Sequence, residues 1–194
     1  MAARAPTIFT EVEYLALEAA SDTKHEFTEG AIVAMAGGSP AHNALAANVT
    51  ASLRAASRGG QCVTLTSDQR IHVPATGLYT YADVVVACGE RRYKSDRPAS
   101  LLNPTVIVEV TSETTEDYDR GKKFLNYQSI PELRDYVLVS HRERRIDHYR
   151  RGDRGEWVVA THAAPEARVA LSGFEGAFTV DDVYDGVDLA EGGP

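Results

Sequence analysis

The stretch PTVIVEVTS, residues 104–112, decides how this chain folds. Four β-branched apolar residues surround a single acid, Glu109, which is typical of a strand that is covered on both faces. A lone ionised carboxylate inside such a strand is costly unless it is paired, protonated or bound to a cation. The stretch therefore predicts a buried strand whose one carboxylate has a specific task.

A second acid stands at the head of another apolar run, YADVVVAC, residues 81–88. Asp83 begins this run, so we expect it at the end of a buried strand. Two carboxylates from neighbouring strand ends can converge on one cation, and Mg²⁺ is commonly held by one or two carboxylates together with water and substrate phosphate. The other interpretation is that each acid forms a buried ion pair or accepts hydrogen bonds.

The segments before these strands predict a helix, a hairpin and a second helix. Thr10 and Glu13 form a capping-box pattern that opens a short helix. Residues 25–36 (HEFTEGAIVAMA) indicate two short strands around a Glu29–Gly30 turn. Ser39 followed by Pro40 is a helix start, and the apolar residues after it recur at helical spacing until Gly59–Gly60.

The remaining segments complete a mixed order of elements. We expect one alternating strand over residues 61–73 (QCVTLTSDQRIHV), a helix over 117–129, a buried strand over 135–140, a hairpin from 144–151 and 155–162, and a turn-rich closing stretch over 171–189. This order favours a mixed α+β fold of the α/β type, with a central mixed β-sheet flanked by helices, an N-terminal helix and hairpin, and a C-terminal β-hairpin extension.

Bulk properties narrow the class of protein. The 194 residues suit one domain spanning 1–194, and 43% hydrophobic with 25% charged residues is ordinary for a globular protein. No apolar run approaches the roughly 20 residues that a membrane span needs, so we expect no membrane contact and a cytoplasmic location. Cys62 and Cys88 lie in apolar runs without zinc-site spacing, and we expect buried, reduced thiols.

The formal net charge of −8 argues against broad attraction to a phosphate backbone. Any contact with DNA must then be local. Two basic stretches could make it: Arg91, Arg92, Lys94 and Arg97, and then Arg142, Arg144, Arg145, Arg150, Arg151 and Arg154. The other interpretation is that these charges lie on solvated loops and edge strands.

Taken together, YADVVV, the stretch PTVIVEVTSETTEDYDRGKKFLNYQSIPELRDYVLVS, HEFTEGAIVAMAGGSPAHN and FEGAFTVDDVY resemble the Uma-two family of restriction-endonuclease-like proteins, which is widespread in bacteria. The resemblance covers most of the chain. It implies the PD-(D/E)xK nuclease fold, in which a helix, three antiparallel strands, a helix and a further strand form the core.

The resemblance also implies a set of site residues. Asp83 matches the motif aspartate and Glu109 the motif glutamate, and the backbone carbonyl of Val110 is implied as a further metal ligand. Thr111 stands where the wider superfamily has a lysine. In the Uma-two pattern the lysine lies on the following helix, where Lys123 matches and Lys122 is the alternative.

Two further positions match the family pattern. Glu26 is implied as a residue that binds or orients a second cation, and His42 as a ligand or proton shuttle near a helix start. Asp119, Lys123 and Tyr127 share a helical face by their fourfold spacing. The other histidines, which show no metal-ligand spacing, we expect at the surface or at strand edges: His25, His72, His141, His148 and His162.

The function that follows is a metal-dependent endonuclease. We expect Mg²⁺ or Mn²⁺ as the cofactor, DNA as the partner and a two-fold homodimer as the assembly. One alternative is a non-catalytic module with the nuclease fold that binds nucleic acid or a protein, suggested by Thr111 and the acidic net charge. Another is a hydrolase of smaller phosphoesters, which would use the same site.

Overall fold

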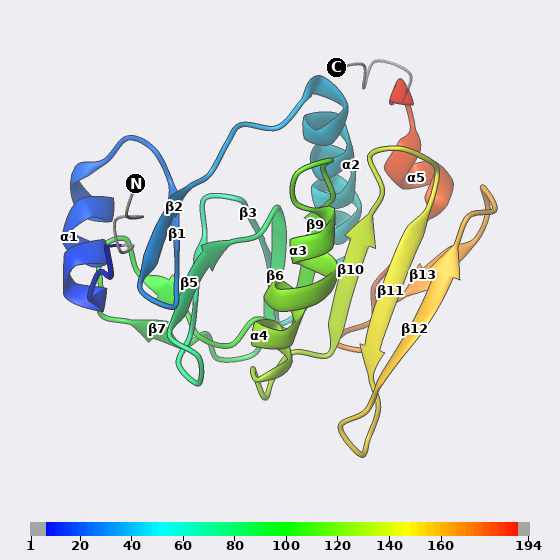
Figure 1. Cartoon of the computed structure of the whole chain (residues 1–194). Helices are drawn as coiled ribbons and strands as arrows, with labels where there is room; N and C mark the ends of the chain where they lie inside the picture. Colours follow the sequence, from blue (N-terminus) through cyan, green and yellow to red (C-terminus); the bar gives the residue numbers. More distant parts are fainter. Residues whose placement is uncertain (1–6, 190–194) are drawn as a thin grey trace.

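The computed structural model describes residues 7–189, whose strands form two six-stranded sheets and one two-stranded sheet (Figure 1). The first sheet has the order β2-β1-β5-β4-β8-β7 and contains β1 (His25–Thr28), β2 (Ala31–Ala34), β4 (Arg70–Val73), β5 (Leu78–Tyr81), β7 (Tyr93–Lys94) and β8 (Ser100–Leu101). The second has the order β12-β11-β10-β9-β6-β3 and contains β3 (Cys62–Thr66), β6 (Val84–Cys88), β9 (Val106–Val110), β10 (Asp135–Val139), β11 (Ile146–Arg151) and β12 (Trp157–His162).

Helices flank the sheets. They are α1 (Glu11–Ala20), α2 (Pro40–Ala56), α3 (Glu116–Tyr118), a π-helical turn η1 (Asp119–Lys123), α4 (Phe124–Gln128) and α5 (Val180–Tyr184). The small third sheet pairs β13 (Arg168–Ala170) with β14 (Ala177–Thr179). In Figure 1, α3 and α4 lie in front of the second sheet, α2 stands behind it, and α1 packs beside the first sheet. The expected mixed α+β architecture is confirmed.

The second sheet is covered on both faces, as the apolar runs predict. Along β9, Val106 and Val108 belong to one core cluster with residues of α2 and α5, whereas Ile107 belongs to another with residues of α4 and β10. Alternate residues of a strand point to opposite faces. The side chain of Glu109 therefore points to the same face as Ile107, where α4 lies.

β9 and β10 are parallel, with Glu109 opposite Leu138 and Val110 opposite Val139. Their neighbours β6 and β11 run antiparallel to them. Parallel strands end at the same edge of a sheet, so the residues that follow β9 and β10 come together. This edge is where the candidate site lies.

The expectation of a single strand over residues 61–73 is wrong. The chain turns after Thr66, where the Gln69 N–H donates to its carbonyl at 3.0 Å, and β3 and β4 join different sheets. β5, which sequence reasoning missed, follows β4, and the chain then returns to the second sheet as β6. Asp83 lies at this return, between the two sheets.

The predicted starts and turns near the N-terminus are confirmed. Thr10 and Glu13 form a reciprocal capping box, and Ser39 accepts the His42 N–H at 3.2 Å at the start of α2. Gly30 has a φ of 80° in the turn between β1 and β2. The hairpin of β11 and β12 is also present. Residues 117–129 are helical as expected, but the helix contains the π turn.

The expectation of reduced thiols is wrong. β3 pairs with β6 so that Cys62 lies directly opposite Cys88, and the two residues form a disulfide. Cross-strand register, which the sequence does not reveal, brings them together. In residues 7–189 no helix has the length and apolar character to cross a membrane.

Two histidines expected at the surface are buried instead. His72 stacks on Tyr79 with ring centroids 4.0 Å apart, and His148 lies 2.8 Å from a carboxylate oxygen of Asp135. Both lie on strands that have a neighbouring strand on each side, β4 and β11, rather than on edge strands. Their partners come from other strands, so spacing along the chain gave no sign of the burial.

Candidate active site

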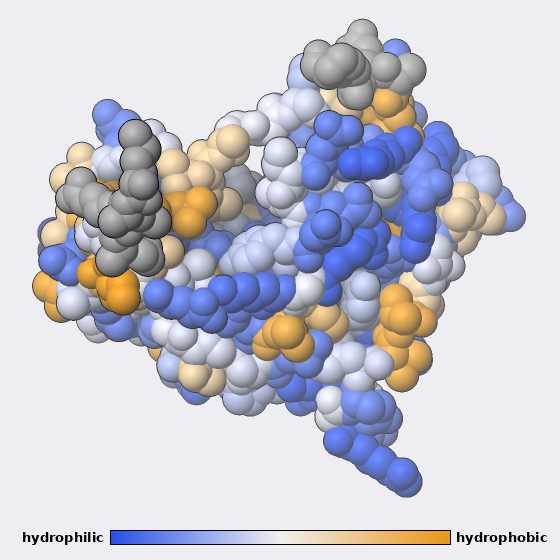
Figure 2. Space-filling model, viewed as in Figure 1, coloured by the Kyte–Doolittle hydropathy of each residue, from blue (hydrophilic) through white to orange (hydrophobic). Residues whose placement is uncertain are grey.

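A cavity of about 600 Å³ lies where the two sheets meet. Figure 2 shows the surface hollowed between the α1 side and the α2 side of the molecule, beneath the segment that links β2 to α2. The cavity is lined by every residue that the sequence and the family resemblance single out for catalysis or metal binding: Glu26, His42, Asp83, Glu109, Val110 and Lys123.

These residues reach the cavity from different parts of the fold. Glu26 comes from β1 of the first sheet, and Asp83 from the crossover between the sheets. Glu109 comes from β9 of the second sheet, His42 from the first turn of α2, and Lys123 from the π turn. No single element holds the site, so its geometry depends on how the sheets and helices pack.

Asp83 is fixed by two contacts. One of its carboxylate oxygens accepts the Val110 N–H at 2.7 Å and lies 3.3 Å from Nε2 of His42. Burial alone would lower the pKa of His42, but the Asp83 carboxylate and the Val110 carbonyl outweigh it and raise the pKa. The contact with Asp83 thus favours the protonated form of His42.

Glu109 is almost fully buried, with 4% of its surface exposed. Its Oε1 lies 2.8 Å from Nζ of Lys123 and accepts from the Tyr127 hydroxyl at 3.0 Å. Burial, the largest cause, together with the charges of Asp119 and Asp83 raises the pKa of Glu109 to about 8 against the opposing effect of Lys123. Asp83 and Glu109 both line the cavity, so the two motif carboxylates lie in the same region.

The structure distinguishes the two candidate lysines. Lys123 is buried and also lies 3.6 Å from Asp119, whereas Lys122 is exposed and pairs with Glu29 at 2.7 Å. Asp119, Lys123 and Tyr127 share the buried face that their spacing predicts, and the Asp119–Lys123 pair is internal rather than a surface salt bridge.

The π turn helps to direct Lys123 inward. A π turn inserts an extra residue into a helix and often marks a functional position. The carbonyl of Asp119 within this turn accepts from the Tyr136 hydroxyl at 2.9 Å, and Phe124 stacks on the same tyrosine ring at 4.9 Å. The irregular turn is therefore held by packing on the second sheet.

Glu26 lies on the first-sheet side of the cavity and is also buried. It accepts a hydrogen bond from Thr80 at 2.6 Å and another from the hydroxyl of Tyr118. Both partners are neutral. The negative charge of Glu26 thus has no basic side chain in direct contact among residues 7–189.

Sequence reasoning missed His141 as a cavity residue and placed it at the surface. Its ring lines the cavity, and its Nδ1 lies 3.2 Å from the hydroxyl of Thr111. His141 comes two residues after β10, so the parallel pairing with β9 brings it to the edge where β9 ends. Tyr118 and Asp119 also line the cavity. No sequence motif identified these two residues as part of the cavity.

The donor set suits a hard divalent cation with few protein ligands. Within residues 7–189 no three side chains of His, Cys, Asp or Glu are grouped to hold a metal ion. Mg²⁺, however, is often bound by only one or two carboxylates, with carbonyl, water and phosphate oxygens as the rest. Four buried or half-buried carboxylates line the cavity, and they outnumber its basic groups: Glu26, Asp83, Glu109 and Asp119. Asp83, Glu109 and the Val110 carbonyl fit such a cation.

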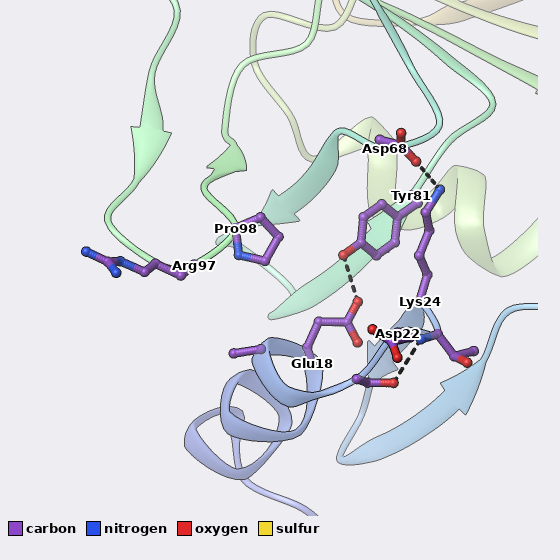
Figure 3. Close-up of a pocket in the computed structure, with 10 residues that line it drawn as sticks. Glu18, Asp22, Lys24, Asp68, Tyr81, Arg97 and Pro98 are labelled. Atoms are coloured by element: carbon purple, nitrogen blue, oxygen red, sulfur yellow. Dashed lines mark hydrogen bonds and ion pairs between the residues drawn. The ribbon is translucent and has the colours of Figure 1, made fainter.

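A second cavity, of about 360 Å³, lies on the other side of Tyr81 (Figure 3). Several of its charged groups have partners within the protein: Lys24 pairs with Asp68 at 2.6 Å, and Glu18 accepts from the Tyr81 hydroxyl at 2.7 Å. The side chain of Arg97 points away from these groups in Figure 3.

Most of the arginines and lysines in the two basic stretches form ion pairs or hydrogen bonds within the protein. Arg92 pairs with Glu132 and Lys94 with Glu11, while Arg145 pairs with Asp147 at 3.1 Å. Arg151 donates to the Ile130 carbonyl at 2.7 Å. Arg142, which follows the cavity residue His141, has 56% of its side chain exposed and lies 3.7 Å from Glu113 and 3.9 Å from Glu116.

Comparison with known proteins gives three kinds of match. A family model named Uma2 and described as "Putative restriction endonuclease" matches residues 12–182. The uncharacterized protein slr1290 of Synechocystis sp. is 38% identical over 175 residues, which cover 90% of each chain. The uncharacterized protein sll1609 of the same organism is 32% identical over 166 residues, covering 85% of this chain and 93% of that one.

A solved structure shares the fold. It is the crystal structure of a "putative nuclease belonging to DUF820" from Anabaena variabilis, which superposes with a TM-score of 0.69 at 14% identity. The match covers 84% of this chain and 91% of that chain. At this identity the likeness concerns the fold alone.

Proposed function

Because this chain belongs to the Uma2 family of restriction-endonuclease-like proteins, we propose that it is a nuclease that hydrolyses phosphodiester bonds of DNA with the help of Mg²⁺ or Mn²⁺. One observation carries the proposal. Asp83 and Glu109, from two different strand ends, line one cavity together with the buried amine of Lys123. This is the arrangement that the PD-(D/E)xK resemblance implies.

In the proposed reaction, Asp83, Glu109 and the carbonyl of Val110 would hold the divalent ion. When bound, such an ion supplies Lewis-acid stabilisation of the phosphate charge and activates water near neutral pH. The Val110 N–H holds the Asp83 carboxylate in place, because it donates to one of its oxygens. Tyr127 does the same for Glu109.

Lys123 contributes positive charge next to the scissile phosphate. Its ammonium is flanked by Glu109 and Asp119 and lies 3.4 Å from the Tyr81 carbonyl, so its direction is fixed before substrate arrives. A preorganised cation in a site with little water stabilises charge that develops in the transition state. Glu26, on the opposite wall, would orient water or a second cation.

DNA contact is proposed to be local, since the net charge of −8 opposes broad attraction. Arg142 follows His141 at the cavity and is half exposed, so it is suited to meet a phosphate next to the cleaved one. A homodimer remains part of the proposal because duplex DNA offers two strands to cut. Analytical ultracentrifugation with and without duplex DNA measures the assembly.

The decisive experiment compares isosteric variants of the two motif acids. Asp83→Asn and Glu109→Gln should each lower cleavage of plasmid DNA in Mg²⁺ or Mn²⁺ by at least about 100-fold, because each removes a carboxylate that would hold the divalent ion. Asp117→Asn, which changes an exposed acid of α3, is the matched control and should cleave like the parent. Circular dichroism must show all three folded. Parent-like cleavage by both motif variants contradicts the proposal.

A non-catalytic binding role is the second candidate, and one observation favours it. Each motif carboxylate already has a basic partner, His42 for Asp83 and Lys123 for Glu109, and Thr111 replaces the usual lysine. Isothermal titration calorimetry separates the two roles. Binding of Mn²⁺ that disappears in Asp83→Asn supports the nuclease, whereas DNA binding without any binding of Mn²⁺ supports the module.

A further inference from the structure

We propose that His141 is the proton acceptor for the attacking water in the proposed cleavage, with its imidazole oriented by the hydroxyl of Thr111. The inference rests on the proposed nuclease function and assigns a role at the same site. Hydrolysis requires a group that takes a proton from water at the moment of attack. The side chains around the cavity differ in whether they can do so.

The position of His141 follows from the parallel pairing of β9 and β10. Thr111 comes directly after β9, and His141 comes two residues after β10 ends. Thr111 is fully buried, and its N–H donates to the Val139 carbonyl at 2.9 Å. The hydroxyl that contacts Nδ1 of His141 at 3.2 Å is therefore anchored to the sheet.

The two ring nitrogens of His141 have different surroundings. Nδ1 faces Thr111, and the ring makes no hydrogen bond through Nε2 to any group among residues 7–189. The ring lines the same cavity as Asp83, Glu109 and Lys123. If Nδ1 carries the hydrogen and donates to Thr111, Nε2 presents its lone pair to the cavity.

His42, the other histidine in the cavity, is placed differently. Its Nε2 faces Asp83 at 3.3 Å, and its Nδ1 is sealed from solvent without a hydrogen-bond partner in the described chain, residues 7–189. With Nε2 engaged by Asp83, the nitrogen left to accept a proton is the sealed Nδ1. Lys123 is surrounded by acceptors, namely Glu109, Asp119 and the Tyr81 carbonyl, so it acts there as a donor.

The electrostatic setting of His141 agrees with this role. Burial and the charge of Arg142 lower its pKa, while Glu116 and Glu113 oppose the shift and His42 adds to it. A lowered pKa leaves the imidazole neutral at pH 7, which is the form that accepts a proton. Groups whose surroundings move their pKa values apart commonly take different parts in acid–base chemistry.

The proposed step balances as an ordinary hydrolysis. The water oxygen forms a bond to phosphorus with one of its electron pairs, and one of its protons moves to Nε2 of His141. The bond from phosphorus to the leaving sugar oxygen breaks, and its electrons stay on that oxygen, which takes a proton from solvent. His141 then releases its proton to solvent, so one water is consumed and a phosphomonoester and an alcohol are formed.

The kinetic test measures DNA cleavage against pH in Mg²⁺ for His141→Ala and the parent. The parent's rate should rise with pH as His141 loses its proton and then level off. The variant should be slower by about 100-fold or more, should lack this rise, and should keep a similar KM. Added imidazole should restore part of the rate. His162→Ala is the matched control, because burial also lowers the pKa of His162 but it lies outside the cavity.

A spectroscopic test does not depend on activity. Nitrogen-15 chemical shifts of metal-free protein at neutral pH should show His141 with its hydrogen on Nδ1. Thr111→Val, which keeps the shape but removes the hydroxyl, should change this tautomer preference and lower the cleavage rate by about tenfold. A hydrogen on Nε2 in the parent overturns the inference.

The outcomes separate the two proposals. If His141→Ala cleaves with the parent's rate and pH profile while Asp83→Asn is inactive, the role of His141 is wrong and the nuclease proposal stands. If Asp83→Asn and Glu109→Gln also cleave like the parent, the nuclease proposal fails and the role of His141 fails with it. Loss in both His141→Ala and Asp83→Asn, with imidazole rescue of the first alone, supports both.

Discussion

The two six-stranded sheets bury their strands by different chemistry. In the second sheet the buried side chains of β6, β9 and β10 are mostly apolar, and Glu109 is an exception. In the first sheet the buried set includes Arg70, His72, Thr80 and Glu26. The comparison shows that the burial of an apolar strand can be predicted from its own residues. A strand with polar side chains is buried only where residues distant in the sequence supply the hydrogen bonds and ion pairs of those side chains.

Arg70 shows how the first sheet is satisfied. The side chain is fully buried, lies 3.2 Å from Asp96 and donates to Ser100 at 2.8 Å. Its guanidinium also lies over the rings of Tyr14 and Tyr79, with centroid distances of 5.7 and 5.5 Å. The first sheet thus depends on one cation that links several strands and α1.

The largest expected effect therefore comes from removing that cation. Arg70→Ala should lower the free energy of unfolding by about 3–5 kcal/mol, because it leaves Asp96 without its partner in a buried setting. Urea denaturation followed by circular dichroism measures the change. Arg92→Ala, which breaks an exposed ion pair with Glu132, is the control and should cost less than about 1 kcal/mol. Equal losses in the two variants would contradict the contrast between the sheets.

A somewhat smaller effect is expected for an apolar deletion in the second sheet. Leu138 lies in β10 and is 1% exposed, so Leu138→Ala should lower the free energy of unfolding by about 3 kcal/mol through lost burial and a cavity. The same urea titration applies. Leu125→Ala changes an exposed leucine on α4 and should have little effect. A loss below that of Leu125→Ala would show that this sheet is not held by its apolar core.

The disulfide at the edge of the second sheet should contribute less. Cys62 and Cys88 close a loop with a sequence separation of 26, and loop closure of this size stabilises a fold by about 2–3 kcal/mol. The double variant Cys62→Ser/Cys88→Ser should therefore melt at a lower temperature in calorimetry. A reducing agent should shift the melting of the parent toward that of the variant and leave the variant unchanged. No shift in either comparison would contradict the pairing.

The smallest expected effect is a loss of folding stability at acidic pH. Burial raises the pKa of Asp135, but His148 and the N–H groups of Ser172 and Gly173 outweigh it and lower the pKa. A carboxyl whose folded pKa lies below its unfolded value stabilises the fold above the unfolded value, about 3.9, and loses this contribution as the pH falls below it. The stability of the parent should thus decline in this range.

Asp135→Asn tests this point, because asparagine does not titrate. The difference in unfolding free energy between the parent and the variant should be largest near neutral pH and should narrow as the pH falls through about 4. Asp153→Asn, in the exposed turn between β11 and β12, should follow the parent at every pH. A difference that stays constant with pH would assign the role of Asp135 to shape rather than charge.

Much of the second sheet was predictable from sequence, because apolar runs, capping residues and turn glycines act locally. PTVIVEVTS and DYVLVS indicate buried strands, and Thr10 with Glu13 indicates a helix start. The division of residues 61–73 between two sheets was not predictable. It depends on a turn at residues 67–69 that carries no glycine or proline, and on strand pairings made elsewhere.

The candidate site shows the same limit. The unusual acid in an apolar strand indicates Glu109, and the acid at the head of another apolar run indicates Asp83. The family pattern adds Lys123, Glu26 and His42, and all five residues line the cavity. His141 could not be found in this way. Its place depends on the parallel register of β9 with β10, and register is a property of the folded sheet rather than of either segment.

Asp83 stands between two sheets, and the other acids of the cavity stand on both sides of it. Neither of the two six-stranded sheets carries all of the candidate site residues by itself. During synthesis, β1 leaves the ribosome long before Lys123, so a growing chain carries these groups while they are still unconnected in space. Proteolytic fragments and partly folded chains would likewise lack an assembled centre, which confines any cutting of nucleic acid to molecules that have finished folding.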